Sequence, residues 1–330
     1  MKFERYILAE VGSVHDGSFG NACKLIEMAA QRGASAVKFQ THIAQHETLD
    51  DAPSPPYFNQ EPRKDYFDRT AFTLEQWKNL ADHCVECNVH FVSSPFSIEA
   101  VELLEQTSIS AYKVASGEVS NLPLLERIVE TGKPVFLSSG MSNWTELDAA
   151  VEILRKNPLI VMQCSSQYPC PFWAVGINVM EEMSDRYSLP VGFSDHTLSD
   201  VAAILAVGHG AVAIEKHVTF SRAMYGSDAP HSCEPDEFNR FTLSLRDAWA
   251  ILDHPVQKHL VKEYDDMKNT FEKSIVTKRN LKAGHVLTME DLAFKKPGDG
   301  IKASLYKEVL GTQLLTDVDC NHKLEWRNLD

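Results

Sequence analysis

Short apolar runs rich in β-branched residues alternate with longer segments in which apolar positions recur every three or four residues. The short runs predict buried strands, and the longer segments predict amphipathic helices. We expect strands at residues 6–11, 34–39, 89–94, 111–114, 134–138, 159–163, 189–193 and 211–214. We expect the main helices at residues 19–32, 74–87, 122–131, 143–156 and 235–252. Eight strand–helix units within about 250 residues are typical of a TIM (β/α)8 barrel.

Three stretches lie outside this alternation. The segment 42–73 is too long and too rich in Pro, Asp and aromatic residues for a simple connection, so we expect a lid or a disordered loop at the active-site end of the barrel. Residues 254–273 form a charged connector, expected to be part helix and part linker. Residues 274–330 contain short apolar runs between glycine turns and predict a small β-rich domain. The predicted organisation is therefore a barrel domain (1–253), a linker (254–273) and a C-terminal domain (274–330).

Composition narrows the function classes. The 330 residues carry 32 basic and 46 acidic side chains, a net charge of −14, which argues against nucleic-acid and anionic-membrane partners. Seven scattered cysteines suit a reducing compartment, and no apolar run approaches the roughly 18 residues of a membrane span. We expect a cytoplasmic protein without a signal peptide.

Polar side chains end all eight predicted strands. In a TIM barrel the carboxyl ends of the strands carry the active site, so these side chains are candidates for chemistry. In chain order they are Glu10, Lys38 with Gln40, Ser94, Lys113 with Ser116 and Glu118, Ser138 with Ser139, Gln163 with Ser165, Ser194 with Asp195 and His196, and Glu215 with His217.

Two groups among these residues indicate a reaction. Lys38 and Lys113, with the neighbouring serines, make a cationic, hydroxyl-rich patch suited to phosphate and carboxylate oxygens. His196 and His217 end neighbouring strands and together suit a divalent metal that acts as a Lewis acid. An anion site beside a metal site predicts a reaction between a phosphorylated substrate and a carbonyl compound.

Structural roles remain open for several of these residues. The lysines could form ion pairs with Glu10 and Glu118 at the barrel mouth, and each histidine could be an ordinary core residue. Cys84 and Cys87 resemble half a zinc site, but they fall in a predicted helix and core packing is favoured. His15 could be catalytic or could brace Glu10.

The motifs at these strand ends resemble those of the sialic acid synthase (N-acetylneuraminate synthase) family along nearly the whole chain. The tail is similar to the family's antifreeze-like (SAF, β-clip) domain. The matching segments are LAEVGSVHDG (8–17), AVKFQTH (36–42), VSSPFS (92–97), AYKVASGE (111–118), GKPVFLSSGM (132–141), CSSQYPCPF (164–172), GFSDHT (192–197), IEKHVT (214–219), LKAGHVLT (281–288) and KKPGDGI (295–301).

This resemblance implies a transferase that condenses phosphoenolpyruvate with the open-chain aldehyde of an N-acylamino sugar, such as N-acetylmannosamine, to give a sialic acid or related nonulosonic acid and phosphate. It implies a divalent metal on His196 and His217, Mn²⁺ above Mg²⁺ or Co²⁺, and a domain-swapped homodimer. Glu10 would handle the water or its proton. The phosphoenolpyruvate ligands would be Lys38, Ser94, Lys113, Ser116, Ser138 and Ser194. The sugar would meet Gln40, Tyr168 and Asp228, and the substrate-binding set also includes Phe96, Glu118, Ser166 and Lys296.

The departures from the family pattern concern the sugar. Lys296 stands where the family has an arginine that reaches the partner's site, and lysine lacks the planar fork of arginine. Gln163 and Ser166 replace a common histidine and asparagine. A legionaminic- or pseudaminic-type synthase using a diacetamido hexose is therefore an alternative. A catalytically inactive sugar- or phosphate-binding protein and a metal aldolase are alternatives of other kinds.

Overall fold

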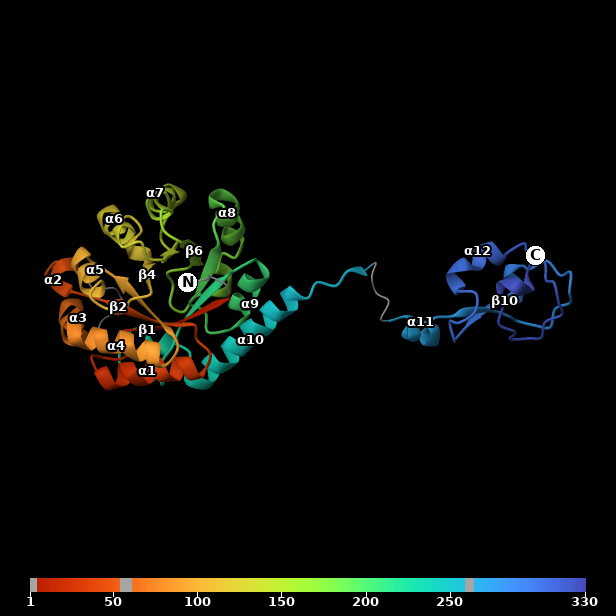
Figure 1. Ribbon diagram of the computed structural model, residues 1–330, viewed down its shortest axis with the longest axis horizontal. Helices are drawn as coiled ribbons and strands as arrows, with labels where there is room; N and C mark the ends of the chain where they lie inside the picture. Colours follow the sequence, from red (N-terminus) through yellow and green to blue (C-terminus); the bar gives the residue numbers. More distant parts are fainter. Residues whose placement is uncertain (1–4, 54–60, 259–263) are drawn as a thin grey trace. The chain divides into compact units, whose positions relative to one another are not determined.

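The computed structural model describes residues 5–53, 61–258 and 264–330. It divides into two compact units, Met1–His254 and Pro255–Asp330 (Figure 1). Among the described helices, none is long and apolar enough to cross a membrane.

The first unit is a closed barrel of eight parallel strands, which confirms the predicted fold class. Each strand pairs with its neighbours in chain order, and β1 closes the barrel against β8. The strands are β1 (Tyr6–Gly12), β2 (Ala36–Thr41), β3 (His90–Pro95), β4 (Ala111–Val114), β5 (Val135–Ser138), β6 (Leu159–Cys164), β7 (Val191–Asp195) and β8 (Ala213–His217).

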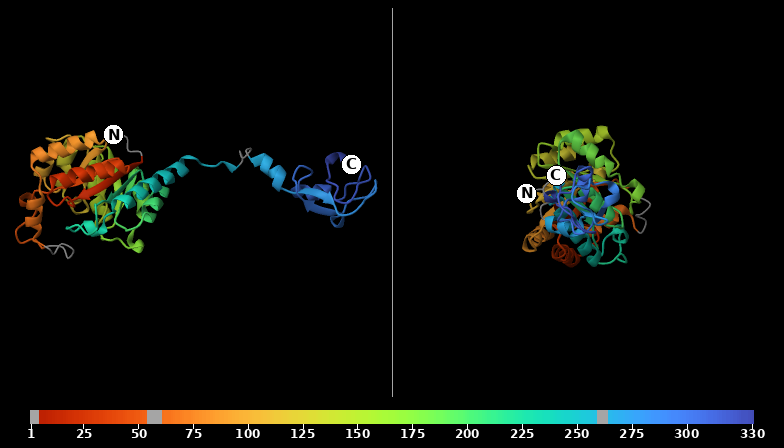
Figure 2. Two further views of the ribbon diagram at one scale, coloured as in Figure 1. Left: turned by 90° about the horizontal axis from the view of Figure 1, so that it is seen from below. Right: turned by 90° about the vertical axis from the view of Figure 1, so that its right-hand side faces the viewer.

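Helices surround the strands on the outside of the barrel (Figures 1 and 2). Their starts are set locally: Ser18 caps α1, and capping boxes open α4 and α7 at Thr73 and Asn143. The helices are α1 (Phe19–Gln31), α2 (Ala44–Glu47), α3 (Arg63–Thr70), α4 (Leu74–Glu86), α5 (Ile98–Leu104), α6 (Leu122–Glu130), α7 (Trp144–Leu154), α8 (Asn178–Tyr187), α9 (Val201–Gly208) and α10 (Pro235–Asp253).

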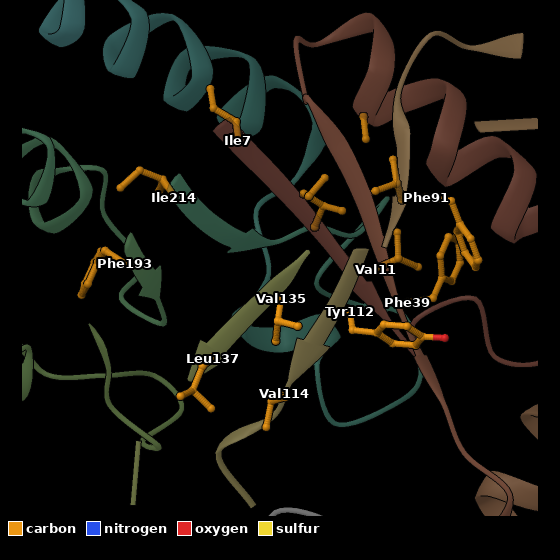
Figure 3. Close-up of a cluster of buried hydrophobic side chains, with 14 of the residues drawn as sticks. Ile7, Val11, Phe39, Phe91, Tyr112, Val114, Val135, Leu137, Phe193 and Ile214 are labelled. Carbon is orange, nitrogen blue, oxygen red and sulfur yellow. The ribbon is translucent and has the colours of Figure 1, made fainter. Parts of the chain in front are cut away.

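Alternation along each strand separates two cores. Side chains that point outward, including Ile7, Phe39, Phe91, Phe193 and Ile214, pack between the strands and the helices (Figure 3). Side chains that point inward fill the barrel itself. They are Tyr6, Leu8, Ala36, Val92, Ala111, Phe136, Ile160, Met162 and Ala213. Because side chains alternate with a period of two, the next inward positions toward the carboxyl ends carry polar residues of the predicted site on seven strands. On β6 that position is Cys164, and the predicted Gln163 points outward, where it bonds Ser139 and the carbonyl oxygen of Val175.

Three strands run at least two residues further than the sequence pattern predicts. β2 ends at Thr41, β7 at Asp195 and β8 at His217, which are two, two and three residues past the expected ends. These polar residues still pair in the ladder, since Asp195 lies opposite Lys216 and His217 lies opposite Glu10. Apolar patterning does not detect a strand end whose side chains are reserved for a site.

The predicted lid segment is partly a packed element. It contains α2 and α3, and α3 buries Tyr66 and Phe67 against the barrel unit. Residues 54–60 lie outside the described residues. Part of the segment expected to be a loop is therefore helical and packed.

The second unit is small and β-rich. Two antiparallel strands, β9 (Ser274–Thr277) and β10 (Leu292–Lys295), combine with isolated bridges and a short helix, α12 (Tyr306–Val309). Its core contains Ile275, Leu281, Leu287, Leu292, Ile301, Val309, Leu314, Val318, Leu324 and Leu329. Before it, the predicted linker contains α11 (Asp265–Phe271), while residues 259–263 of that linker lie outside the described residues.

Candidate active site

Four charged side chains meet inside the barrel at the carboxyl ends of four strands. The ammonium of Lys38 lies 2.8 Å from Glu10 Oε2 and 3.8 Å from Glu215 Oε2. The ammonium of Lys113 lies 3.2 Å from Glu215 Oε1. All four side chains are almost completely buried. Burial by itself would raise the pKa of the Glu215 carboxyl, but Lys113 and Lys38 lower it below its usual range.

Serine hydroxyls complete this charged cluster. Lys38 Nζ donates to Ser94 Oγ at 3.4 Å, and Ser194 Oγ donates to Glu215 Oε1 at 2.9 Å. Ser138, at the end of β5, is also buried. Ser116 is only partly buried and lies on the wall of the adjoining cavity, with its Oγ 3.3 Å from Cys164 Sγ. The lysines and serines predicted from sequence as an anion patch thus face the barrel interior together, except that Ser116 is less buried than the others.

His196 and His217 lie side by side, as expected for neighbouring strand ends. Their ring centroids are 5.6 Å apart. His196 Nδ1 lies 2.6 Å from the carbonyl oxygen of Ser165 and donates to it, so the lone pair of Nε2 faces the site. Tyr168 donates its hydroxyl to that Nε2 at 3.2 Å and stacks on the ring at 4.1 Å. Burial and the neighbouring His217 lower the pKa of His196 to about 3, so the ring is neutral at pH 7.

These two imidazoles fit a divalent metal as a pair. A neutral ring binds a metal through its free nitrogen, so a metal on His196 Nε2 would replace the hydrogen bond from Tyr168. The buried Nδ1 of His217 has no hydrogen-bond partner among the described residues. The described residues contain no group of three or more His, Cys, Asp or Glu side chains placed to hold a metal. A metal here would therefore depend on water and substrate oxygens for its remaining ligands.

A cavity of about 340 Å³ borders this cluster, and several predicted sugar-binding residues line it. Gln40 links the two, because its side-chain amide donates to Glu10 Oε1 at 2.9 Å. His217 also lines the cavity. The predicted residues on its wall are Gln40, Phe96, Ser116, Ser166, Tyr168, His217 and Asp228. Glu118 is not among the described lining residues; it accepts a hydrogen bond from Asn121, the residue that caps α6.

Gly12 makes room for one wall of this cavity. Its φ of +54° is in the left-handed region, and a Cβ added there would lie 2.6 Å from Asp228 Oδ2 and 3.3 Å from Gln40 Nε2. Only a residue without a side chain lets the carboxylate of Asp228 approach the backbone at position 12 so closely. The glycine of the first motif therefore has a steric reason at this position.

Other residues of the site were not assigned a role from the sequence. Glu215 was visible only as one of many polar strand ends, yet it bridges the two lysines. His42, Arg63 and His231 line the cavity from connecting segments. His42 follows β2 closely enough to have been noticed, whereas nothing in the sequence pattern places Arg63 or His231 near the barrel mouth.

The sequence left structural roles open for the two lysines and for His15, and the structure answers each differently. Lys38 does pair with Glu10, but Lys113 pairs with Glu215 and not with Glu118. His15 accepts from the backbone N–H of Gly17 at 3.1 Å and packs on Phe72, and burial lowers its pKa to about 4. These contacts favour a role in shaping its own turn.

The cysteine pair behaves as helix packing. Cys84 is buried on α4, and Cys87 lies at the end of that helix with its Sγ 3.8 Å from His83 Nε2. Both belong to the part of the chain in which no metal-holding group of three ligands occurs. The zinc alternative is therefore not supported.

Lys296 belongs to the second unit. Its ammonium lies over the ring of Phe271, 5.2 Å from the centroid. This is a cation–π contact within the unit. Any contribution of Lys296 to a barrel site stays a prediction.

Comparison with known proteins gives a consistent result for both units. The NeuB family model matches residues 25–257, and the SAF domain model matches residues 272–318. An N,N'-diacetyllegionaminic acid synthase of Campylobacter jejuni is 35% identical over 315 residues, covering 92% of this chain and 94% of that protein. The N-acetylneuraminate-9-phosphate synthase of Homo sapiens is 30% identical over 297 residues, covering 88% and 82%. The solved N-acetylneuraminic acid synthetase of Leptospira borgpetersenii has a TM-score of 0.70 at 28% identity and covers 80% of this chain and 90% of its own.

Proposed function

The chain belongs to the NeuB family, and on this basis we propose that it condenses phosphoenolpyruvate with an N-acylamino sugar aldehyde to form a nonulosonic acid and phosphate. The observation that carries the proposal is the buried cluster of Lys38, Lys113, Glu10 and Glu215 beside a histidine pair. Two fixed ammonium groups and several hydroxyls, withdrawn from water, match the oxygens of an enol phosphate carboxylate.

The charge balance of the cluster supports a metal partner. The two lysines and two glutamates carry formal charges that cancel, and His196 is neutral at pH 7. Phosphoenolpyruvate would therefore enter a buried site with no surplus positive charge. A divalent cation held by His196 and His217, Mn²⁺ in our proposal, would supply that charge and polarise the aldehyde oxygen.

The remaining roles follow from where the side chains lie. Lys38, Lys113, Ser94, Ser138 and Ser194 hold the phosphate and carboxylate oxygens, and Ser116 reaches them from the rim of the site. C3 of phosphoenolpyruvate forms a bond to the aldehyde carbon, whose oxygen becomes an alkoxide. Water adds to C2, and Glu10 positions this water, receives one of its protons and passes it on to the alkoxide. The tetrahedral C2 then expels phosphate by breaking its C–O bond, and the proton of its hydroxyl leaves with the phosphate, so the 2-keto acid remains.

The cavity beyond Gln40 would receive the sugar. Gln40, Tyr168 and Asp228 present amide, hydroxyl and carboxylate groups, and Phe96 and Ser166 line the same space. N-acetylmannosamine or a close relative is the first candidate acceptor. A diacetamido hexose is the second, because Lys296 replaces the family arginine and a 35% identical relative is named a diacetyllegionaminic acid synthase.

The proposed assembly is a domain-swapped homodimer, in which each C-terminal unit serves the barrel of the partner. This assembly would bring Lys296 of the partner subunit to the sugar. Sedimentation velocity on the full chain tests it, with a dimer expected and a monomer at all concentrations counting against it.

Release of phosphate from phosphoenolpyruvate tests the reaction. We expect release with Mn²⁺ only when an acceptor sugar is present, across a panel of N-acetylmannosamine, its 6-phosphate and diacetamido hexoses. Binding of phosphoenolpyruvate without turnover on any acceptor would favour a binding protein. Cleavage of a phosphorylated sugar without phosphate release would instead indicate a metal aldolase.

A further inference from the structure

The side chain of His42 is held on all sides beside the cavity. Its ring is stacked between Phe67 and Phe96, with centroid separations of 3.6 Å and 4.1 Å and interplanar angles of 18° and 15°. Its Nδ1 lies 2.8 Å from Glu47 Oε1, and its Nε2 lies 3.2 Å from Gln40 Oε1. The side chains of His42 and Glu47 are 6% and 4% exposed, so water does not compete for these bonds.

The donors and acceptors available fix the direction of the hydrogen bonds that run from His42 through Gln40 to Glu10. The carboxylate of Glu10 can only accept, so the NH₂ group of Gln40 faces it, at 2.9 Å from Oε1. The carbonyl oxygen of the same amide then faces His42, and His42 must donate from Nε2. If His42 carried its proton on Nδ1 alone, the acceptors His42 Nε2 and Gln40 Oε1 would face each other. Nothing from His42 would then hold the Gln40 amide in this orientation.

Glu47 supplies the other half of the requirement. With a proton on Nε2, the 2.8 Å contact between Nδ1 and Glu47 Oε1 also needs one proton, carried by either atom. The pair as a whole is then neutral, which suits its burial between two phenyl rings. The second oxygen of Glu47 has no hydrogen-bond partner among the described residues, so the hydrogen bond described for this carboxyl is the one with His42.

We propose that His42 and Glu47 are positioning residues that lock the side-chain amide of Gln40 with its NH₂ group on Glu10 and its carbonyl on His42. This inference rests on the proposed function, because Gln40 is taken as a sugar contact and Glu10 as the group that handles water. The lock acts on the sugar through Gln40 and reaches the phosphoenolpyruvate half only through the hydrogen bond from Gln40 to Glu10. Among the described residues, no hydrogen bond or ion pair joins His42 to the lysine and serine groups proposed to hold phosphoenolpyruvate.

Three variants separate the lock from packing. His42→Phe keeps an aromatic ring between Phe67 and Phe96 but removes the donor to Gln40. Glu47→Ala removes the partner of Nδ1. Glu47→Gln keeps it, because an amide N–H can donate to Nδ1 and thereby maintain the proton on Nε2.

Steady-state kinetics on the full chain give the first readout. We expect His42→Phe and Glu47→Ala to lower kcat/KM for the acceptor sugar by roughly tenfold, the scale of a lost buried hydrogen bond, without changing the Kd for phosphoenolpyruvate. Glu47→Gln should restore most of that loss. The proposal is overturned if His42→Phe matches the parent enzyme, if phosphoenolpyruvate binding weakens equally, or if Glu47→Gln falls as far as Glu47→Ala.

A second readout does not depend on turnover. In chain labelled with ¹⁵N-histidine, the His42 signals are those missing from His42→Phe, and their shifts report which ring nitrogen carries hydrogen. We expect a proton on Nε2 in the parent and in Glu47→Gln; an unprotonated Nε2 would overturn the lock. If the parent releases no phosphate with any acceptor, the proposed function fails, while this measurement still decides the arrangement of His42, Glu47 and Gln40.

Discussion

Asp195 and Lys216 form a buried ion pair directly behind the two histidines, with 2.8 Å between Oδ2 and Nζ. They are register partners on β7 and β8, and each immediately precedes one histidine of the pair. Because neighbouring strand residues point to opposite faces, this pair points outward while His196 and His217 point inward. Lys216 also donates to the carbonyl oxygens of Thr197 and Ser199, so one ammonium fixes the chain that follows His196.

Replacing Lys216 with Met should therefore destabilise the barrel strongly. Removal of one partner leaves the Asp195 carboxylate buried and uncompensated, which costs about 3–5 kcal/mol. Urea unfolding measured at pH 7 checks the size of the loss. Asp195→Asn in the same chain should recover part of it, and a double variant no more stable than Lys216→Met alone would contradict the pairing argument.

Replacing Gly12 with Ala should reduce turnover of the acceptor sugar while leaving the chain folded. The new Cβ would lie 2.6 Å from Asp228 Oδ2, so that carboxylate must move, and misplacement by about 1 Å costs on the order of a hundredfold in rate. Gly20→Ala is the matched control. Gly20 lies on α1 with open space around it, so its replacement should keep activity and add up to ~1 kcal/mol of stability. Equal activity in the two variants would remove the steric role of Gly12.

Much of the barrel could be predicted because its chemistry is periodic. Strands such as β4 and β5 appear at their observed places, and the last inward position of each, Lys113 and Ser138, is polar. The partner choice of Lys113 could not be predicted, because Glu118 is near in sequence whereas Glu215 becomes a neighbour only when the barrel closes. Cavity residues on connecting segments, such as Arg63, could not be predicted either, because connecting segments have no hydrophobic periodicity that shows where their side chains lie.

Replacing His217 with Ala should abolish tight Mn²⁺ binding, because only one of the two proposed histidine ligands would remain. Isothermal titration with Mn²⁺ measures this directly, and a chelator should stop phosphate release in the parent until Mn²⁺ is restored. His209→Ala is the control, since the side-chain contact described for His209 is an exposed pair with Glu181. Unchanged Mn²⁺ affinity in His217→Ala would exclude this residue as a ligand.

Acid should destabilise the C-terminal unit through Asp291. Burial alone would raise the pKa of this carboxyl, but hydrogen bonds from His285, Arg279 and Thr288 lower it well below its usual range. A carboxyl with a lowered pKa in the folded state stabilises the fold above the unfolded value, near 3.9, and loses that contribution as the pH falls through the folded value.

Hydrogen exchange of residues 274–330 should therefore show protection that is constant near pH 6 and falls below about pH 4. Asp291→Asn should remove most of this dependence and lower protection already at pH 6. Asp317→Asn serves as the comparison, because Asp317 forms an exposed pair with Lys282 and should change little. A pH response unchanged by Asp291→Asn would assign the effect to other carboxyls.

Replacing Lys296 with Arg should raise kcat/KM for N-acetylmannosamine if the C-terminal unit serves the partner's barrel. A guanidinium offers two parallel donors to an acyl carbonyl where an ammonium offers one point charge, a difference worth up to about tenfold. Lys295→Arg is the control, because Lys295 already donates to Asn321 within its own unit and should leave the rate unchanged. A gain confined to Lys296→Arg and to monoacetylated sugars would mean that position 296 sets acyl recognition. If Lys296→Arg lowers kcat/KM for both N-acetylmannosamine and diacetamido hexoses, the lysine is the residue adapted to both acceptors. If kcat/KM changes for neither acceptor, position 296 does not belong to the sugar site.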